Sequence, residues 1–323
     1  MTSSGAAEAA GRTGPGFVDG LRELAERLAV SGGDVARRML AEFDSRGPGS
    51  QGLGSRSKSS ETDPVTVIDT SVEEHLRREI AAARPGDTVL GEEGGEGGEV
   101  TDEAPGDPPG APAGGPSGEP AGDPVDGDFA GAREPRVRWV VDPVDGTVNL
   151  LYGIPFTAVS VAAEVDGVVV AGAVHNIVTR ETWSGGSGRG AALREADGTT
   201  TALRVSDCAD LSLALVGTGF AYDAGIRAEQ GRVVAELLPR VRDIRRCGSA
   251  ALDLCMLATG RLDAYYERGL KYWDHAAGAL IAAEAGAVVA VSEDDAVPTT
   301  GATPGVSAEF LSALAGATGR LSS

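Results

Sequence analysis

The hydrophobic positions near the start of the chain have the spacing of an amphipathic helix. Apolar side chains recur every three or four residues through 17–43, at Leu21, Leu24, Leu28, Val35 and Leu40. Gly32 and Gly33 interrupt this pattern, so that either one bent helix or two shorter helices fit it. In both cases the pattern predicts a long helical segment at the beginning of the fold.

A second helix is predicted at 71–83, after a short extended stretch at 64–68. Asp69, Thr70 or Ser71 is expected to cap it, because short polar side chains accept hydrogen bonds from the free amides of a helix's first turn. The helix would then begin only after these polar residues.

Strand patterns follow in the first half of the chain. Short apolar runs at 88–90 and 138–141 are typical of buried strands. Residues 157–165 and 168–175 form two further apolar runs, joined by Asp166-Gly167, a pair favoured in tight hairpin turns. These segments together predict an antiparallel sheet.

Beyond residues 185–190 strands and helices alternate. Strands are predicted at 213–217, 241–245, 264–266 and 287–291, and helices at 227–238, 249–258 and 273–285. Such alternation is typical of a sheet with helices packed against it. We therefore predict an α/β layered sandwich of the α+β type, in which an antiparallel-sheet subdomain at 17–186 packs on a mixed-sheet α/β subdomain at 187–323.

Residues 94–135 interrupt this order. They include ten acidic residues, one basic residue, twelve glycines and eight prolines, so burial of the few apolar side chains does not offset the entropy lost on ordering. We interpret this segment as a disordered acidic insertion, with an interaction tail as the alternative, and residues 1–16 as a disordered tail. The net charge of −20 argues against a nucleic-acid partner.

The remaining composition narrows the class of protein. A chain of 323 residues can bury one large core or two joined ones. No uninterrupted run of 18 apolar residues predicts a membrane span, and residues 1–16 lack the apolar segment of a signal peptide. Cys208, Cys247 and Cys255 lie among apolar neighbours, as free thiols in a reducing compartment do. We expect a cytoplasmic protein with no membrane partner.

The strongest candidate for chemistry is Asp142-Pro-Val-Asp145-Gly-Thr147-Val-Asn149, where a buried strand ends in two carboxylates. Asp142 and Asp145 offer oxygen ligands to a hard cation, and the Val144 carbonyl can add a third. Gly146 lets the backbone approach a ligand closely, and if Thr147 opens a helix, the amides of Gly146 and Thr147 face a phosphate. A turn that merely reverses the chain is the alternative interpretation.

Two more groups of carboxylates come from other elements. Glu92 and Glu93 follow a predicted strand, and Asp274 lies at the start of a predicted helix. Taken singly, the two glutamates fit the beginning of an acidic loop and Asp274 fits a helix cap. Hydrolysis by two metal ions, however, needs carboxylates from separate elements around one phosphate. All three segments together meet that need.

The segments Asp142-Pro-Val-Asp-Gly-Thr-Val-Asn149 and Trp273-Asp-His-Ala-Ala-Gly278 resemble signatures of the inositol monophosphatase family, whose members are magnesium-dependent, lithium-sensitive phosphatases. Lys58, Asp63-Pro-Val-Thr66 and Asp69 resemble an earlier family stretch, and Gly91-Glu92-Glu93 resembles its acidic strand end. The resemblance covers about 17–291. It leaves out residues 1–16, the acidic insertion and a tail after about 306.

The resemblance implies two to three magnesium ions and a set of ligands for them. Glu92, Asp142 and the Val144 carbonyl would hold one ion. Asp142, Asp145 and Asp274 would hold a second, and Glu92 would also face a third. Every one of these residues is present in the chain.

The resemblance also implies catalytic roles. Asp69 and Thr147 are similar to the pair that orients and deprotonates the attacking water, and Lys58 would support the site by its charge. His275 stands beside Asp274, and we expect it to pack behind the site rather than to bind metal or act as a base.

Substrate residues follow from the same resemblance. Gly248, Ser249, Ala250 and Glu267 match the family's polyol-binding segments, and the Glu267 carboxylate can accept hydrogen bonds from ring hydroxyls. A solvated glutamate at a strand end is the alternative for Glu267. Second phosphate contacts and ordinary surface charge both remain open for Arg245, Arg246 and Lys271.

The predicted function is that of a metal-dependent phosphomonoesterase acting on a small polyol monophosphate, myo-inositol monophosphate first, through in-line attack of water. Histidinol phosphate, fructose 1,6-bisphosphate and 3'-phosphoadenosine phosphate are alternative substrates, because fold alone does not choose among them. A regulatory partner of the transcription machinery is the alternative of another class. The resemblance further implies a homodimer.

Overall fold

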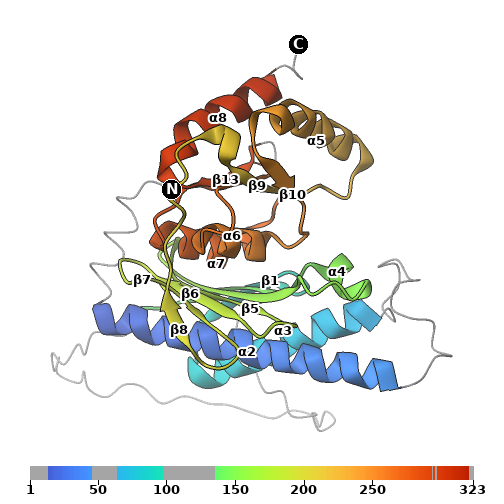
Figure 1. Ribbon diagram of the computed structural model, residues 1–323. Helices are drawn as coiled ribbons and strands as arrows, with labels where there is room; N and C mark the ends of the chain where they lie inside the picture. The colour runs from blue at the N-terminus through green and yellow to red at the C-terminus, as the bar shows by residue number, and fades with distance from the viewer. Residues whose placement is uncertain (1–13, 46–63, 98–134, 293, 295–296, 320–323) are drawn as a thin grey trace, which may run out of the picture.

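The computed structural model describes residues 14–45, 64–97, 135–292, 294 and 297–319 (Figure 1). Lys58 lies outside these residues, as does 98–134, which is most of the predicted acidic insertion. The described residues form two sheets and the helices packed on them, as the predicted layered α/β sandwich requires.

The first helical layer contains α2 (Pro15–Ser45) and α3 (Pro64–Ala83). Helix α2 is continuous through Gly32 and Gly33, and Gly33 lies against His175 of the first sheet. A Cβ added at Gly33 would stand 2.4 Å from His175 Cδ2, so glycine is needed there for close packing rather than for a break.

Helix α3 corrects the predicted beginning of the second helix. It starts at Pro64, so residues 64–68 are helical rather than extended, and Asp69 lies inside the helix rather than at its cap. Proline is well suited to the first turn of a helix, because the amide hydrogen that it lacks has no partner there. Asp69 is fully buried as a result.

The first sheet has eight strands in the order β2-β1-β3-β4-β5-β6-β7-β8. Its members are β1 (Thr88–Gly91), β2 (Gly95–Gly97), β3 (Arg138–Asp145), β4 (Ala158–Val165), β5 (Val168–Asn176), β6 (Thr182–Gly186), β7 (Gly190–Arg194) and β8 (Thr200–Ala202). The predicted hairpin between β4 and β5 is confirmed, with Asp166 and Gly167 both at positive φ. Neighbouring strands are antiparallel except β1 and β3.

The parallel pairing of β1 and β3 brings two predicted site segments together. Gly91 pairs with Val141, so Glu92, which follows β1, lies beside Asp142, the next residue of β3. Parallel strands end at the same edge of a sheet, which is the reason that carboxylates some 50 residues apart in sequence meet there.

The second sheet has the order β10-β9-β11-β13-β12 and is mixed, as predicted. Its strands are β9 (Leu215–Thr218), β10 (Asp243–Arg245), β11 (Ala264–Glu267), β12 (Val288–Ala290) and β13 (Thr299–Ala302). The accompanying helices are α4 (Thr147–Leu151), α5 (Ala224–Leu237), α6 (Ala250–Ala258), α7 (Tyr272–Glu284) and α8 (Pro304–Gly319), with short 3₁₀ turns η2 (Leu211–Leu213) and η3 (Leu238–Arg240).

The elements stack in alternating layers, as Figure 1 shows. Helices α2 and α3 cover one face of the first sheet, α6 and α7 lie between the sheets, and α5 and α8 cover the outer face of the second. Three clusters of buried apolar side chains fill the space between these layers. Burial of both sheets between helices accounts for the apolar runs in the sequence.

One boundary differs from that expected. The first sheet continues through β7 and β8, so the change of sheet falls between Ala202 and Leu215 rather than near Gly186. Helix α8 buries Phe310 against the second sheet, within the subdomain predicted at 187–323. None of the helices in the described ranges is long and apolar enough to cross a membrane.

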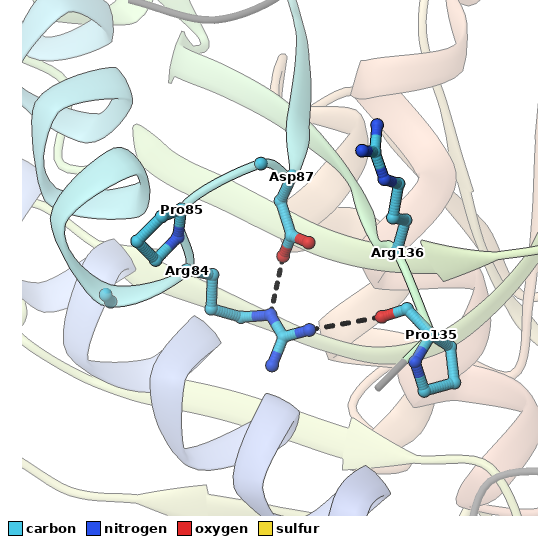
Figure 2. Close-up of a pocket in the computed structure, with 7 residues that line it drawn as sticks. Arg84, Pro85, Asp87, Pro135 and Arg136 are labelled. Atoms are coloured by element: carbon cyan, nitrogen blue, oxygen red, sulfur yellow. Dashed lines mark hydrogen bonds and ion pairs between the residues drawn. The ribbon is translucent and has the colours of Figure 1, made fainter. Parts of the chain in front are cut away.

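An ion pair between Arg84 and Asp87, in the connection from α3 to β1, makes hydrogen bonds to the start of β3 (Figure 2). Arg84 donates to Asp87 Oδ2 over 2.5 Å and to the Pro135 carbonyl over 3.2 Å. The Asp87 carboxylate also accepts from the Val137 amide at 3.1 Å and the Trp139 indole at 3.0 Å. Arg84, Asp87 and Pro135 line a cavity of about 300 Å³, and none of the predicted site residues lines it. Their hydrogen bonds fix the strand that carries Asp142.

Candidate active site

One cavity of about 290 Å³ collects most of the predicted site residues from both halves of the chain. Its lining residues are Glu92, Asp142, Val144, Asp145, Gly146, Thr147, Val148, Phe220, Ala221, Tyr222, Arg246, Gly248, Ala250, Glu267, Arg268, Gly269, Leu270, Lys271, Trp273 and Asp274. The strand ends of the first sheet therefore face loops of the second across a shared space.

The turn after β3 has the conformation predicted for it. Gly146 has φ 87°, and a Cβ there would stand 2.7 Å from the Phe156 carbonyl oxygen, so glycine is required. Thr147 opens α4, and its hydroxyl donates to the Val144 carbonyl over 3.0 Å. The Val144 amide donates to Asp142 Oδ1 over 3.1 Å. This turn fixes the Asp142 carboxylate, which is 2% exposed.

Asp145 is held from the other half of the molecule. Its Oδ2 accepts hydrogen bonds of 2.7 Å from the Ser249 hydroxyl and 2.7 Å from the Ala251 amide, at the start of α6. Ser249 is among the residues predicted to bind substrate. Its hydroxyl joins Asp145 to the cap of α6, where it also accepts from the Leu252 amide. Gly248 and Ala250, on either side of it, line the cavity.

Asp274 caps a helix and also lines the cavity. It lies in the first turn of α7, and its Oδ2 accepts from the Lys271 amide over 2.7 Å, as a capping box does. It also lines the cavity. The hydrogen bond that caps α7 therefore also holds the Asp274 carboxylate at the cavity.

The other predicted residues lie around this centre. Glu92 lines the cavity, whereas Glu93 is exposed. Asp69 lies behind the lining on α3, close enough for its charge to act on Asp142. His275 is buried and packs its ring 5.6 Å from that of Tyr272, in agreement with the packing role predicted for it.

The carboxylates repel one another. Burial, followed by the charges of Asp145, Glu92, Asp274 and Asp69, raises the pKa of Asp142 well above its ordinary value. Burial raises the pKa of Asp145 to about 6, and burial together with the charge of Asp145 raises that of Asp274 to about 8. A bound cation would stabilise the ionised forms and reverse these shifts.

The donors fit a hard cation by their chemistry. Carboxylate and carbonyl oxygens are the ligands that magnesium prefers, and Glu92, Asp142, Asp145, Asp274 and Val144 supply them around one cavity. Within the described ranges, no three His, Cys, Asp or Glu side chains are already gathered closely enough to enclose an ion. The predicted ligands thus line an open space and do not form a closed cage.

Glu267 faces the carboxylate group from the end of β11. Its Oε2 accepts from the Tyr265 hydroxyl over 2.8 Å, and burial raises its pKa to about 7. Gly219 is needed beside it, because an added Cβ would stand 2.0 Å from Glu267 Oε2. The glutamate is therefore held at the cavity wall and is not the solvated strand end that was its alternative.

The loop after β9 was not predicted to belong to the site. Phe220, Ala221 and Tyr222 line the cavity, and the Arg246 guanidinium carbon lies 6.0 Å from the centre of the Phe220 ring. The sequence Gly219-Phe-Ala-Tyr222 carries no metal-ligand or phosphate-binding spacing that would have indicated it. Only the fold places this loop beside Glu267.

Comparison with known proteins finds matches along most of the chain. A model of the inositol monophosphatase family matches residues 19–315. An inositol-1-monophosphatase of Mycobacterium leprae is 47% identical over 301 residues, which cover 91% of this chain and 93% of that protein. A Nus factor SuhB of Pseudomonas aeruginosa is 34% identical over 269 residues, which cover 82% and 83%.

A solved structure is similar over nearly the same range. Mycobacterium tuberculosis SuhB shares 42% identity with this chain at a TM-score of 0.71, with 93% of this chain and 97% of that one covered. The family match extends to residue 315, inside α8, and so passes the limit of about 291 predicted from the sequence.

Proposed function

The chain belongs to the inositol monophosphatase family, and from that premise we propose that it hydrolyses myo-inositol monophosphate to inositol and phosphate. As a family member it is a phosphoric monoester hydrolase. The observation that carries the substrate proposal is that Glu267 lies across one cavity from Asp142, Asp145 and Asp274. A polyol phosphate can offer its hydroxyls to Glu267 and its phosphate to the side of the cavity that holds the three aspartates.

We assign magnesium to Glu92, Asp142, Asp145, Asp274 and the Val144 carbonyl, as two to three ions. When bound, magnesium would neutralise charge on the phosphate and activate the attacking water. The mutual repulsion of these carboxylates favours such a cation.

The protein's own groups would position the reactants for in-line attack. Asp69 and Thr147 orient the water and accept its proton, with Lys58 adding positive charge. The cavity wall at Gly146 and Thr147 receives the phosphate. The site thus separates a phosphate side, formed by the first sheet, from a hydroxyl side, formed by the second.

The polyol ring would lie on the hydroxyl side. Gly248 and Ala250 leave room for it, because glycine has no side chain and alanine only a methyl group at the cavity that they line. Glu267 accepts hydrogen bonds from the ring hydroxyls, which are worth about 1.5 to 3 kcal/mol each to a charged acceptor. Ser249 acts indirectly, by holding Asp145.

A panel of phosphate esters assayed with magnesium tests the substrate. The panel contains myo-inositol 1-phosphate, histidinol phosphate, fructose 1,6-bisphosphate and 3'-phosphoadenosine phosphate. We expect the highest kcat/KM for the inositol ester. A higher value for another ester would replace inositol phosphate as the substrate while leaving the phosphatase activity in place.

A regulatory role is the second candidate, because one relative is named Nus factor SuhB. The Asp142→Asn variant separates the two functions. A regulatory protein would retain stoichiometric binding to purified RNA polymerase in this variant, whereas an enzyme would lose turnover. We further propose that the protein acts in the cytoplasm and that it forms a homodimer. Light scattering on the purified protein tests the oligomeric state.

A further inference from the structure

Glu73 on α3 is a buried carboxylate with no place in the proposed metal set. Its side chain is 3% exposed, and it lies four residues after Asp69, on the same side of the helix. A buried carboxylate is costly unless it is paired and hydrogen-bonded. The partners of Glu73 therefore indicate what it is for.

Those partners lie in the turn that carries Glu92. Glu73 Oε2 accepts from the Glu93 amide over 2.8 Å, and Oε1 accepts from the Gly94 amide over 2.9 Å. Both oxygens are thus used by successive amides directly after Glu92. Hydrogen bonds from amides to an ionised carboxylate are roughly twice as strong as those between neutral groups.

Arg77 acts together with Glu73, and we call these two residues the clamp. Its Nε donates to Glu73 Oε1 over 2.9 Å, while Nη2 donates to the Gly95 carbonyl over 2.9 Å and Nη1 to the Val89 carbonyl over 3.3 Å. Val89 and Gly95 belong to β1 and β2, which flank the turn. The guanidinium therefore bridges the two strands on either side of Glu92.

Two glycines show that the turn is packed directly on this pair. A Cβ at Gly91 would stand 2.4 Å from Glu73 Cδ, and one at Gly94 would stand 2.7 Å from Glu73 Oε1. Any larger residue at either position would displace the carboxylate or the turn. The contact is therefore specific to the residues found there.

We propose that Glu73 is a positioning residue of the active site, which together with Arg77 holds the turn bearing Glu92 in register with Asp69 and Asp142. Asp69 and Glu73 share one helix, and Glu92 and Asp142 directly follow Gly91 and Val141, which are paired on neighbouring strands. The clamp ties these two pairs together. The inference rests on the proposed function for the roles of Glu92 and Asp69.

Glu73→Gln tests this role, and Glu74→Gln is its matched control, since Glu74 is exposed on the same helix. A glutamine offers one oxygen acceptor and turns an amide donor toward the other backbone amide. We expect the magnesium concentration for half-maximal rate to rise about tenfold to a hundredfold in Glu73→Gln. The rate at saturating magnesium should stay within about threefold of the parent.

Binding of Mn²⁺ to metal-free protein, followed by electron paramagnetic resonance, gives a readout without substrate. The affinity for Mn²⁺ should fall in Glu73→Gln and stay unchanged in Glu74→Gln. Gly94→Ala, which displaces the carboxylate without removing it, should weaken Mn²⁺ binding too and provides the test if Glu73→Gln does not fold.

The outcomes separate the two proposals. Equal Mn²⁺ affinities and equal magnesium dependence in Glu73→Gln, Gly94→Ala and Glu74→Gln would overturn the positioning role. If Glu73→Gln and Gly94→Ala bind Mn²⁺ more weakly while the parent protein hydrolyses no polyol phosphate, the clamp is supported and the proposed substrate is contradicted. A parent protein that binds no Mn²⁺ would overturn both.

Discussion

The Ser249 hydroxyl donates a hydrogen bond of 2.7 Å to Asp145 Oδ2 and so joins the start of α6 to the end of β3. The bond crosses between the two halves of the molecule. Asn149 strengthens the same junction by donating a 2.8 Å bond to the Cys247 carbonyl, while its 2.8 Å bond to the Phe156 carbonyl stays within its own half. The site is therefore assembled by docking of the halves and not within either one.

Removal of the Ser249 hydroxyl should accordingly weaken the site. In Ser249→Ala, Asp145 loses one of its two donors from α6 and the helix loses its cap, so kcat/KM should fall about tenfold to a hundredfold. Loss of the cap should also cost about 1 kcal/mol of stability. Kinetics at several magnesium concentrations and thermal unfolding measure the two effects.

Ser212→Ala is the matched control, because the Ser212 hydroxyl also donates to an aspartate, Asp210, over 2.7 Å, but at an exposed position outside the cavity. It should leave kinetics unchanged. Equal kinetics for the parent and Ser249→Ala would show that Asp145 does not depend on this bond.

Glu267→Gln tests the hydroxyl side of the site. The variant keeps the size of the side chain and removes its charge, so kcat/KM for inositol phosphate should fall by about tenfold to a hundredfold. An aryl phosphate, which lacks neighbouring hydroxyls, should be hydrolysed at nearly the parent rate. Equal losses on both esters would assign Glu267 a structural role in place of substrate recognition.

Arg246→Gln tests whether Arg246 binds a substrate that carries one phosphate, or whether only a substrate with a second phosphate would use it. Arg246 lines the cavity, whereas the neighbouring Arg245 pairs with Asp243 at 2.6 Å and does not line it, so Arg245→Gln is the control. With inositol monophosphate we expect Arg246→Gln to change kcat/KM by less than about threefold. A loss above about tenfold on that ester, from a charged hydrogen bond, would mean that Arg246 binds the substrate directly.

The metal-free protein should become less stable as the pH rises from about 5 to about 9. Burial is the main cause that raises the folded-state pKa to about 6 for Asp145, about 7 for Glu267 and about 8 for Asp274, and the charge of Asp145 adds to the last two shifts. Raised carboxyl pKa values favour the folded state while the groups are protonated, and this contribution is lost as the pH passes through those values.

Thermal unfolding in a chelator and in magnesium, at pH 5.5, 7 and 8.5, measures this dependence. The stabilisation by magnesium should grow with pH, because the metal needs the ionised carboxylates. Asp274→Asn should flatten the metal-free slope. A metal-free melting temperature that rises across this range would contradict the assigned repulsion.

The sequence predicted the parts of the site that have local signatures. The turn at Gly146, the hairpin at Asp166 and the cavity position of Asp274 follow from turn chemistry and short motifs, and all are found in the structure. The extent of α3 was missed, because the apolar pattern of residues 64–68 fits an extended stretch and a first helical turn equally well.

Contacts made only by the fold were beyond prediction. Glu73 reads as one of several glutamates on a helix, and its bonds to the Glu93 and Gly94 amides arise from packing of α3 on the first sheet. Ser249 was assigned to substrate by the family resemblance, and its bond to Asp145 joins residues 104 positions apart in sequence. Local pattern carries no information about such partners.

The most direct test of the central claim is phosphate release from myo-inositol 1-phosphate by the parent protein and by Asp142→Asn, with Asp207→Asn, which replaces an exposed carboxylate, as the control. We expect turnover by the parent and the control in magnesium, none in a chelator, and a loss of at least about a hundredfold in Asp142→Asn. Turnover by Asp142→Asn within threefold of the parent, or undiminished turnover in the chelator, would contradict a metal-dependent phosphatase centred on Asp142.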